Sequence, residues 1–197
     1  MLNEYQQVVE RHRHRVYSFA HYSLRAREDA EDVTQEVFIK LWQHWRKIDQ
    51  EKIGGWLMRV AHNAVIDKVR KGKSSKNGDS QQDAYAEVED QGQVDDPGAE
   101  IDREEFRLQL QRAIQGLEEP FRSIVILRDI QGLSYVDIQE CLGMSESQVK
   151  VYLHRSRRKL RENAELRALF ESARNRSTAS NKNQESNDSA ESAANTE

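Results

Sequence analysis

The residues best suited to binding chemistry in this chain lie in one short basic segment, from Ser145 to Arg161. The segment contains a single anionic side chain, Glu146, against six cationic ones. The cations are Lys150, Arg155, Arg157, Arg158, Lys159 and Arg161. Ser145 with Gln148 three residues later has the pattern of a capping box, which predicts that a helix begins here. A helix with this charge is suited to phosphate contacts beside a DNA groove.

Apolar spacing predicts which side of this helix is buried. One stripe recurs at three- and four-residue intervals, formed by Val149, Leu153, Ser156 and Leu160. The opposite face carries Ser147, Val151, His154, Arg155 and Arg158. Just upstream, Gly143 is suited to end a preceding short helix. Two helices around a tight turn, the second one basic, predict a helix-turn-helix that lies in a DNA major groove.

Other arrangements that could carry chemistry are missing from the sequence. It has no glycine-rich phosphate loop, no metal-ligand spacing and no nucleophile paired with a base. His12 and His14 are two positions apart, which places them on different faces of a helix. Cys141 is the only cysteine, so no intrachain disulfide is possible, and its apolar neighbours predict a core position. We expect no enzymatic activity, no cofactor and no metal.

Hydrophobic periodicity divides the chain into two helical blocks. The first block predicts three helices, over residues 3–24, 28–46 and 54–71. The second predicts a helix near Asp102–Gln115, another that opens at Pro120, and then the helix-turn-helix. Strand alternation is missing from both. We therefore expect an all-α fold of two small helical domains, the second a helix-turn-helix domain. The expected divisions are a first domain at 1–71, a linker at 72–100, a second domain at 101–171 and a tail at 172–197.

The net charge of −4 conceals an uneven distribution. Residues 72–100 carry two cationic and eight anionic side chains, a net of −6, with few apolar residues. That composition predicts a flexible acidic linker, and residues 172–197 predict a disordered tail. We find neither a secretory signal pattern nor an apolar run near the length of a membrane span. We expect a cytoplasmic protein without membrane insertion.

Three segments, taken in order, resemble the extracytoplasmic-function (ECF) class of bacterial RNA polymerase sigma factors. Residues 29–42, DAEDVTQEVFIKLW, resemble the family's polymerase-binding helix. Residues 55–70, GWLMRVAHNAVIDKVR, resemble its −10 element helix. Residues 117–135, LEEPFRSIVILRDIQGLSY, continue into the helix-turn-helix and resemble its −35-reading domain. The resemblance covers about residues 3–71 and 104–165.

This resemblance implies a factor that binds core RNA polymerase, recognises −10 and −35 promoter elements and directs transcription initiation at a specific regulon. The implied partners are the clamp helices of the largest polymerase subunit, the flap of the second largest, and promoter DNA in duplex and single-stranded form. An anti-sigma factor is a further possible partner. The alternative is a regulator with the same helix-turn-helix, which would bind duplex DNA without polymerase and usually carries a sensing domain or a dimer interface.

The resemblance also implies which residues act. The polymerase-binding positions are Asp29, Asp32, Gln35, Glu36 and Phe38. The −10 positions are Arg59, His62, Asn63, Arg70 and Lys71, with a pocket for an extruded base in the loop at about residues 44–52. The −35 positions are Ser147, Gln148, Lys150, Val151, Tyr152, His154, Arg155 and Arg158.

Two details qualify these assignments. Val151 and Tyr152 depart from the family, which has serine and arginine there, so the −35 sequence that is read stays open. Trp42, Trp45 and Trp56 are expected in the core rather than on a stacking surface.

Overall fold

The computed structural model describes residues 2–75, 97–169 and 171, and its regular structure is helical throughout these residues. Within the described residues no strand occurs, which confirms the all-α prediction. The predicted linker is described only at its two ends, and most of it lies outside the described residues. The predicted tail, 172–197, also lies outside them.

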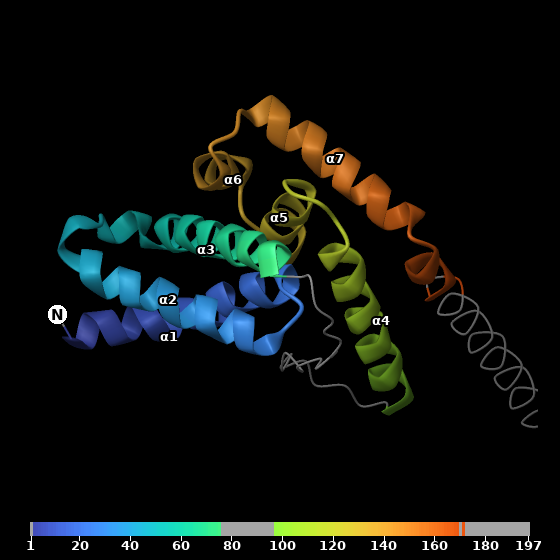
Figure 1. Cartoon of the computed structure of the whole chain (residues 1–197), viewed down its shortest axis with the longest axis horizontal. Helices are drawn as coiled ribbons and strands as arrows, with labels where there is room; N and C mark the ends of the chain where they lie inside the picture. The colour runs from blue at the N-terminus through green and yellow to red at the C-terminus, as the bar shows by residue number, and fades with distance from the viewer. Residues whose placement is uncertain (1, 76–96, 170, 172–197) are drawn as a thin grey trace, which may run out of the picture.

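Helices α1 (Leu2–Ser23), α2 (Arg27–His44) and α3 (Ile53–Ser75) form the first block (Figure 1). Two short 3₁₀ turns, Trp45–Lys47 and Gln50–Lys52, join α2 to α3. The apolar stripes that predicted these helices meet in the interior. Their fully buried members include Phe19, Val37, Leu41, Leu57 and Val65. Burial of these stripes stabilises three helices whose exposed faces are strongly polar.

The second block comprises α4 (Pro97–Gln115), α5 (Phe121–Val125), α6 (Tyr135–Leu142) and α7 (Glu146–Glu162). A π-helical segment, Ile126–Ile130, continues α5. Both predicted signals of the turn are confirmed: Ser145 and Gln148 form a capping box, and Gly143 ends α6 with φ of +66°. A second capping box, between Ser134 and Asp137, opens α6 and was not predicted.

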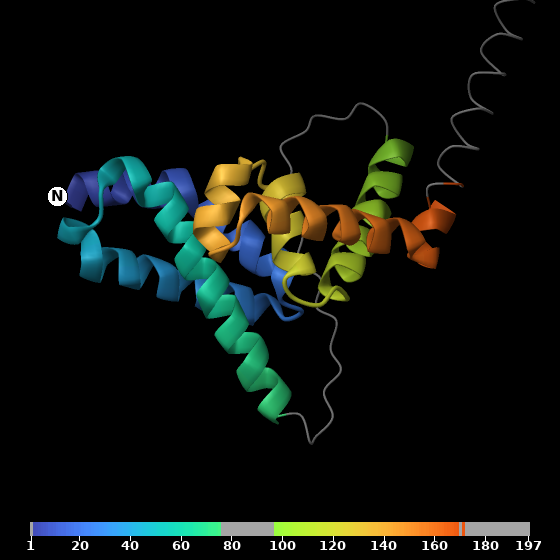
Figure 2. The same ribbon diagram turned by 90° about the horizontal axis from the view of Figure 1, so that it is seen from above.

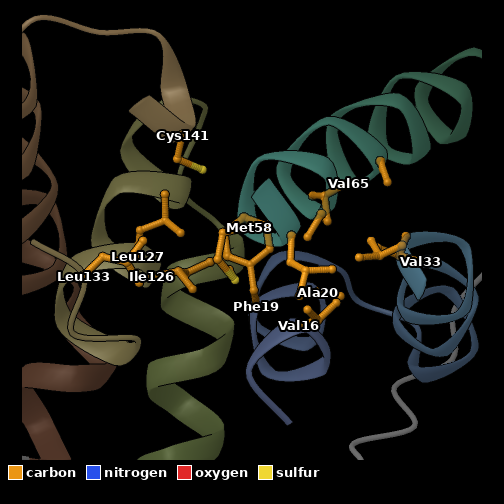
Figure 3. Close-up of a cluster of buried hydrophobic side chains, with 14 of the residues drawn as sticks. Val16, Phe19, Ala20, Val33, Met58, Val65, Ile126, Leu127, Leu133 and Cys141 are labelled. Carbon is orange, nitrogen blue, oxygen red and sulfur yellow. The ribbon is translucent and has the colours of Figure 1, made fainter. Parts of the chain in front are cut away.

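The two blocks share one continuous apolar core. In Figure 3, Phe19 and Met58 of the first block lie beside Ile126 and Leu127 of the second, and Cys141 lies close by. Seen from two directions, α6 lies across α3 (Figures 1 and 2). The sequence predicted both blocks but not this contact between them.

Candidate nucleic-acid interface

Helix α7 presents a basic face that its own start and its buried stripe hold in place. The Ser145 backbone N–H donates to Gln148 Oε1 at 2.9 Å, and the Gln148 N–H donates to Ser145 Oγ at 3.3 Å. Val149, Leu153 and Ser156 are buried, as predicted. The Ser156 hydroxyl donates to carbonyls of Phe121 at 2.9 Å and Tyr152 at 2.7 Å, which satisfies a polar group inside the core.

Seven of the eight predicted −35 residues are exposed on α7. They are Ser147, Gln148, Lys150, Val151, His154, Arg155 and Arg158. The side chains of Gln148 and Tyr152 are engaged within the protein. Gln148 has its side-chain oxygen in the capping box, and half-buried Tyr152 packs edge-on against Phe121 with ring centroids 5.6 Å apart. Tyr152 lies about 100° around the helix from Val151, with its ring against Phe121, and this does not fit its prediction as a −35 position.

Ion pairs account for part of the charge of α7. Arg157 donates from Nε and Nη2 to the two carboxylate oxygens of Asp129, and this ion pair holds α7 against the π-helical segment. Lys159 lies over the Phe121 ring, 4.9 Å from its centroid. These two contacts lie within the second block, although Arg157 and Lys159 both remain exposed, and the sequence could not predict which cations of α7 would make them.

Helix α3 carries a narrower polar stripe. Arg59, Asn63 and Arg70 are exposed and fall within about 40° of one another around the helix. Arg70 pairs with Asp67 at 3.2 Å. Lys71 is also exposed, further around the helix.

His62 does not share this stripe. Its Nδ1 lies 3.1 Å from Ser123 Oγ on α5, and burial lowers the pKa of its imidazole although Glu119 nearby acts to raise it. A neutral ring is the form that this burial favours. In this arrangement His62 faces the second block and not solvent, which does not fit the predicted contact with DNA.

On α2 the predicted polymerase-binding residues separate into two groups. Asp32, Gln35 and Glu36 are exposed, and Asp29 is partly exposed. Lys68 of α3 pairs with Asp29 at 2.9 Å and with Asp32 at 3.0 Å, and these bonds raise the pKa of its ammonium group. Asp29, Asp32, Gln35 and Glu36 thus form a largely acidic stripe on α2, and Lys68 holds its first part against α3.

Phe38 is different: it is only 8% exposed and belongs to the core, which does not fit its prediction as an apolar anchor. The exposed apolar side chains of α2 are Ile39 and Trp42, at 56% and 44%. Trp42 was predicted in the core, which is wrong, whereas Trp45 is buried as expected. Helical spacing was a signal for the exposed pair, because Gln35, Ile39 and Trp42 fall on one face.

A cavity of about 320 Å³ opens where α2 ends. It is lined by Trp42, Gln43, Trp45, Arg46 and Lys47. Tyr5 packs edge-on against both tryptophans, with centroids 5.0 and 5.5 Å away, and so fixes the aromatic wall. Aromatic rings beside cationic side chains suit an unstacked base and its phosphate. The cavity overlaps the loop where the sequence predicted such a pocket but did not select residues.

Comparison with known proteins agrees with this geometry. Residues 8–75 match the family model for Sigma-70 region 2, and residues 107–160 match the model for Sigma-70, region 4. The chain belongs to the ECF class of the sigma-70 family. The first match contains α2 and α3, and the second contains the helix-turn-helix.

Curated relatives place this sigma factor among ECF factors of several bacteria. It is 35% identical to the ECF RNA polymerase sigma factor SigE of Mycolicibacterium smegmatis over 79% of this chain and 60% of that protein. It is 31% identical to the ECF RNA polymerase sigma factor SigX of Bacillus subtilis over 77% of this chain and 78% of that protein. The chain thus spans less than two thirds of the SigE relative.

Solved structures share the fold. The sigma factor RpoE of Bartonella quintana, solved with the anti-sigma factor NepR, superposes with a TM-score of 0.66 at 20% identity. The match covers 81% of this chain and 95% of that one. CnrH, solved with the cytosolic domain of CnrY, gives 0.60 at 20% identity over 87% of this chain and 90% of that one.

Neither a membrane-spanning helix nor a metal-binding cluster occurs among the described residues of this sigma factor. Across the described residues, no helix combines the length and apolar character needed to cross a membrane. In the same part of the chain, His, Cys, Asp and Glu side chains form no cluster suited to a metal ion.

Proposed function

We propose that this sigma factor binds core RNA polymerase through α2, opens and reads the −10 element with α3 and the adjoining loop, and reads the −35 element with α7. The observation that carries the proposal is the presence of two separate DNA-suited faces. One, on α7, is broad and cationic; the other, on α3, is narrow and polar, and an aromatic cavity opens in the segment that leads from α2 to α3. Duplex contacts and single-strand contacts require these different surfaces.

Each surface takes a defined part. On α7, Arg155 and Lys150 supply phosphate or base-edge contacts, and Val151 offers a methyl-sized contact to thymine. On α3, Arg59 holds phosphate while the Asn63 amide both donates to and accepts from a base edge. The cavity beside Trp42 receives an unstacked base of the −10 element.

The exposed stripe of α2 docks on the polymerase clamp helices. Asp32 and Glu36 supply the negative charge, Gln35 lies between them, and Ile39 supplies the apolar contact in place of Phe38. The second block contacts the polymerase flap. An anti-sigma factor is a further partner, as in the complex of RpoE with NepR. Such a factor acts in the cytoplasm, where the polymerase is.

The test is run-off transcription with purified bacterial core polymerase across a genomic promoter library, with and without this protein. We expect discrete new transcripts that share a two-part upstream motif. Arg155→Ala should reduce these transcripts at least tenfold, whereas Arg13→Ala, an exposed arginine of α1, should not. Duplex binding without polymerase and no new transcripts would support the alternative regulator instead.

A further inference from the structure

Arg157 lies at the edge of the basic face of α7, beside two residues that are predicted to contact the −35 element. Helical spacing forms one exposed row along this edge, at intervals of three and four residues. The row is Lys150, His154, Arg157 and Arg161. A cavity of about 590 Å³ opens along the row, and all four side chains line it. An arginine at the edge of a helix in the major groove is placed to contact a backbone phosphate.

Asp129 occupies the guanidinium of Arg157. Its two carboxylate oxygens accept from Nε, at 2.9 Å, and from Nη2, which makes the pair bidentate. A bidentate pair is stronger and more directional than a single contact between charges. The two residues are 28 positions apart, so the pair fixes Arg157 against another element, the π-helical segment Ile126–Ile130. The Asp129 side chain is only 30% exposed, which limits screening of the pair by salt.

Two other ion pairs of α7 leave their cations available. Lys150 pairs with Glu146, and Arg158 lies 3.6 Å from Glu162, in both cases between residues four positions apart on α7. The side chains of both pairs are more than half exposed. Exposed pairs of this kind contribute little to stability and give way readily to another anion. A DNA phosphate can therefore recruit Lys150 and Arg158, whereas it would have to displace a bidentate carboxylate to recruit Arg157.

The segment that carries Asp129 is itself held in place. Arg128 Nη1 donates to the Leu133 carbonyl at 2.6 Å, and the Arg128 guanidinium lies over the Tyr135 ring, 5.0 Å from its centroid. Residues 126–130 form a π-helical turn, a rare conformation that often occurs at functional sites. These contacts fix the turn against the start of α6, and the turn presents the Asp129 carboxylate to α7.

We propose that Asp129 is a specificity-determining residue of the −35 surface, because it withholds Arg157 from the DNA backbone. Phosphate contacts strengthen binding to every sequence alike, whereas base contacts distinguish one sequence from another. Withholding one cation therefore lowers non-specific binding. The same pair keeps α7 in one orientation for the base contacts of Lys150 and Arg155. The effect on −35 recognition rests on the proposed function, whereas the withholding of Arg157 rests on the ion pair.

The test compares two adjacent arginines in binding to duplex DNA of random sequence. The full chain is titrated into a labelled duplex at several salt concentrations, and the slope of log affinity against log salt reports the number of phosphate contacts. Arg158→Gln, the matched control, should weaken binding and make the slope shallower by about 0.9. Arg157→Gln removes the same charge at the next position but should leave the slope unchanged, because Asp129 already occupies this arginine.

Asp129→Ala should have the opposite effect. It frees Arg157, so the slope should become steeper by about 0.9 and affinity at about 0.05 M salt should rise at least about threefold. Asp129→Ala/Arg157→Gln should lose this gain, which separates a freed arginine from the mere loss of a negative charge. Far-UV circular dichroism checks that each variant keeps its helices.

Three results would overturn the proposal. The first is a gain in affinity that persists in Asp129→Ala/Arg157→Gln. The second is a slope for Arg157→Gln as shallow as that of Arg158→Gln. The third is no measurable binding of Asp129→Ala to the random duplex at about 0.05 M salt, because a freed arginine would then hold no phosphate.

Run-off transcription by the holoenzyme separates this proposal from the proposed function. Asp129→Ala should reduce at least about threefold the ratio of transcripts from an intact promoter to those from one with a mutated −35 element. An unchanged ratio would overturn the role of Asp129 in specificity. A steeper slope of DNA binding with no promoter-dependent transcripts from any form would leave the withholding of Arg157 standing and refute the proposed function.

Discussion

Replacing Ser145 or Gln148 would test whether the start of α7 is built for helix capping or for base reading. Gln148 lies among the positions that the family resemblance assigns to DNA, yet its side-chain oxygen accepts from the Ser145 N–H at 2.9 Å. Loss of an N-cap costs about 1 kcal/mol of unfolding free energy. Ser145→Ala should therefore cost about 1 kcal/mol, and Gln148→Ala, which removes one of two reciprocal bonds, about 0.5 kcal/mol.

Urea unfolding followed by far-UV circular dichroism measures these losses. All three tryptophans lie in the first block, so their fluorescence reports that block and serves as an internal reference. Ser145→Asp is the matched control, because aspartate also caps helices and should keep the stability.

DNA binding then distinguishes the two roles of Gln148. If capping is its role, Gln148→Ala should weaken binding to all duplex sequences alike. An unchanged unfolding free energy with an altered −35 base preference would refute the reasoning and return Gln148 to base reading.

The remaining predictions concern burial. Trp45→Ala should cost about 3–5 kcal/mol in urea unfolding, because this ring is 7% exposed. Trp42→Ala should lower the free energy of unfolding by only about 1–2 kcal/mol, and it should reduce promoter opening measured with permanganate footprinting. Equal losses of unfolding free energy in Trp42→Ala and Trp45→Ala would contradict the burial assigned to the two rings. Burial lowers the pKa of His62 below 6.5 despite Glu119, so the buried contact of His62 with Ser123 should be fully stabilising above pH 6.5 and should weaken as pH falls below it. An unfolding free energy that does not fall between about pH 7.5 and about pH 5.5, measured by urea unfolding and compared with His62→Gln, would argue against that role. Burial raises the pKa of the Cys141 thiol to about 12, so alkylation at about pH 8 should require unfolding or opening, and rapid reaction of the native chain would contradict this.

Local signals in the sequence were sufficient for much of the fold. The helix caps formed by Ser145 with Gln148 and by Gly143 depend only on residues three or four positions away. They could therefore be predicted, and the structure confirms them. Helical periodicity placed Val149 in the core, and apolar neighbours placed Cys141 there; both are buried. The family and the all-α class also follow from ordered segments of sequence.

Pairings between distant residues could not be predicted. Arg157 and Arg158 are chemically alike and adjacent, yet only Arg157 meets Asp129 across the fold. Phe38 and Ile39 are both apolar, and a rotation of about 100° decides which is buried. Side-chain type gives no information on what lies opposite in space.

The sequence by itself determined the helices, their caps, the basic face of α7 and membership of the sigma-70 family. The tertiary structure alone decided that α6 lies on α3, that Gln111 and Gln115 complete the end of α1, and that His62 faces Ser123. The physical reason is range. Capping and periodicity act over three or four residues, whereas these hydrogen bonds join residues 61 to 94 positions apart, where only the packed fold brings a donor to its acceptor.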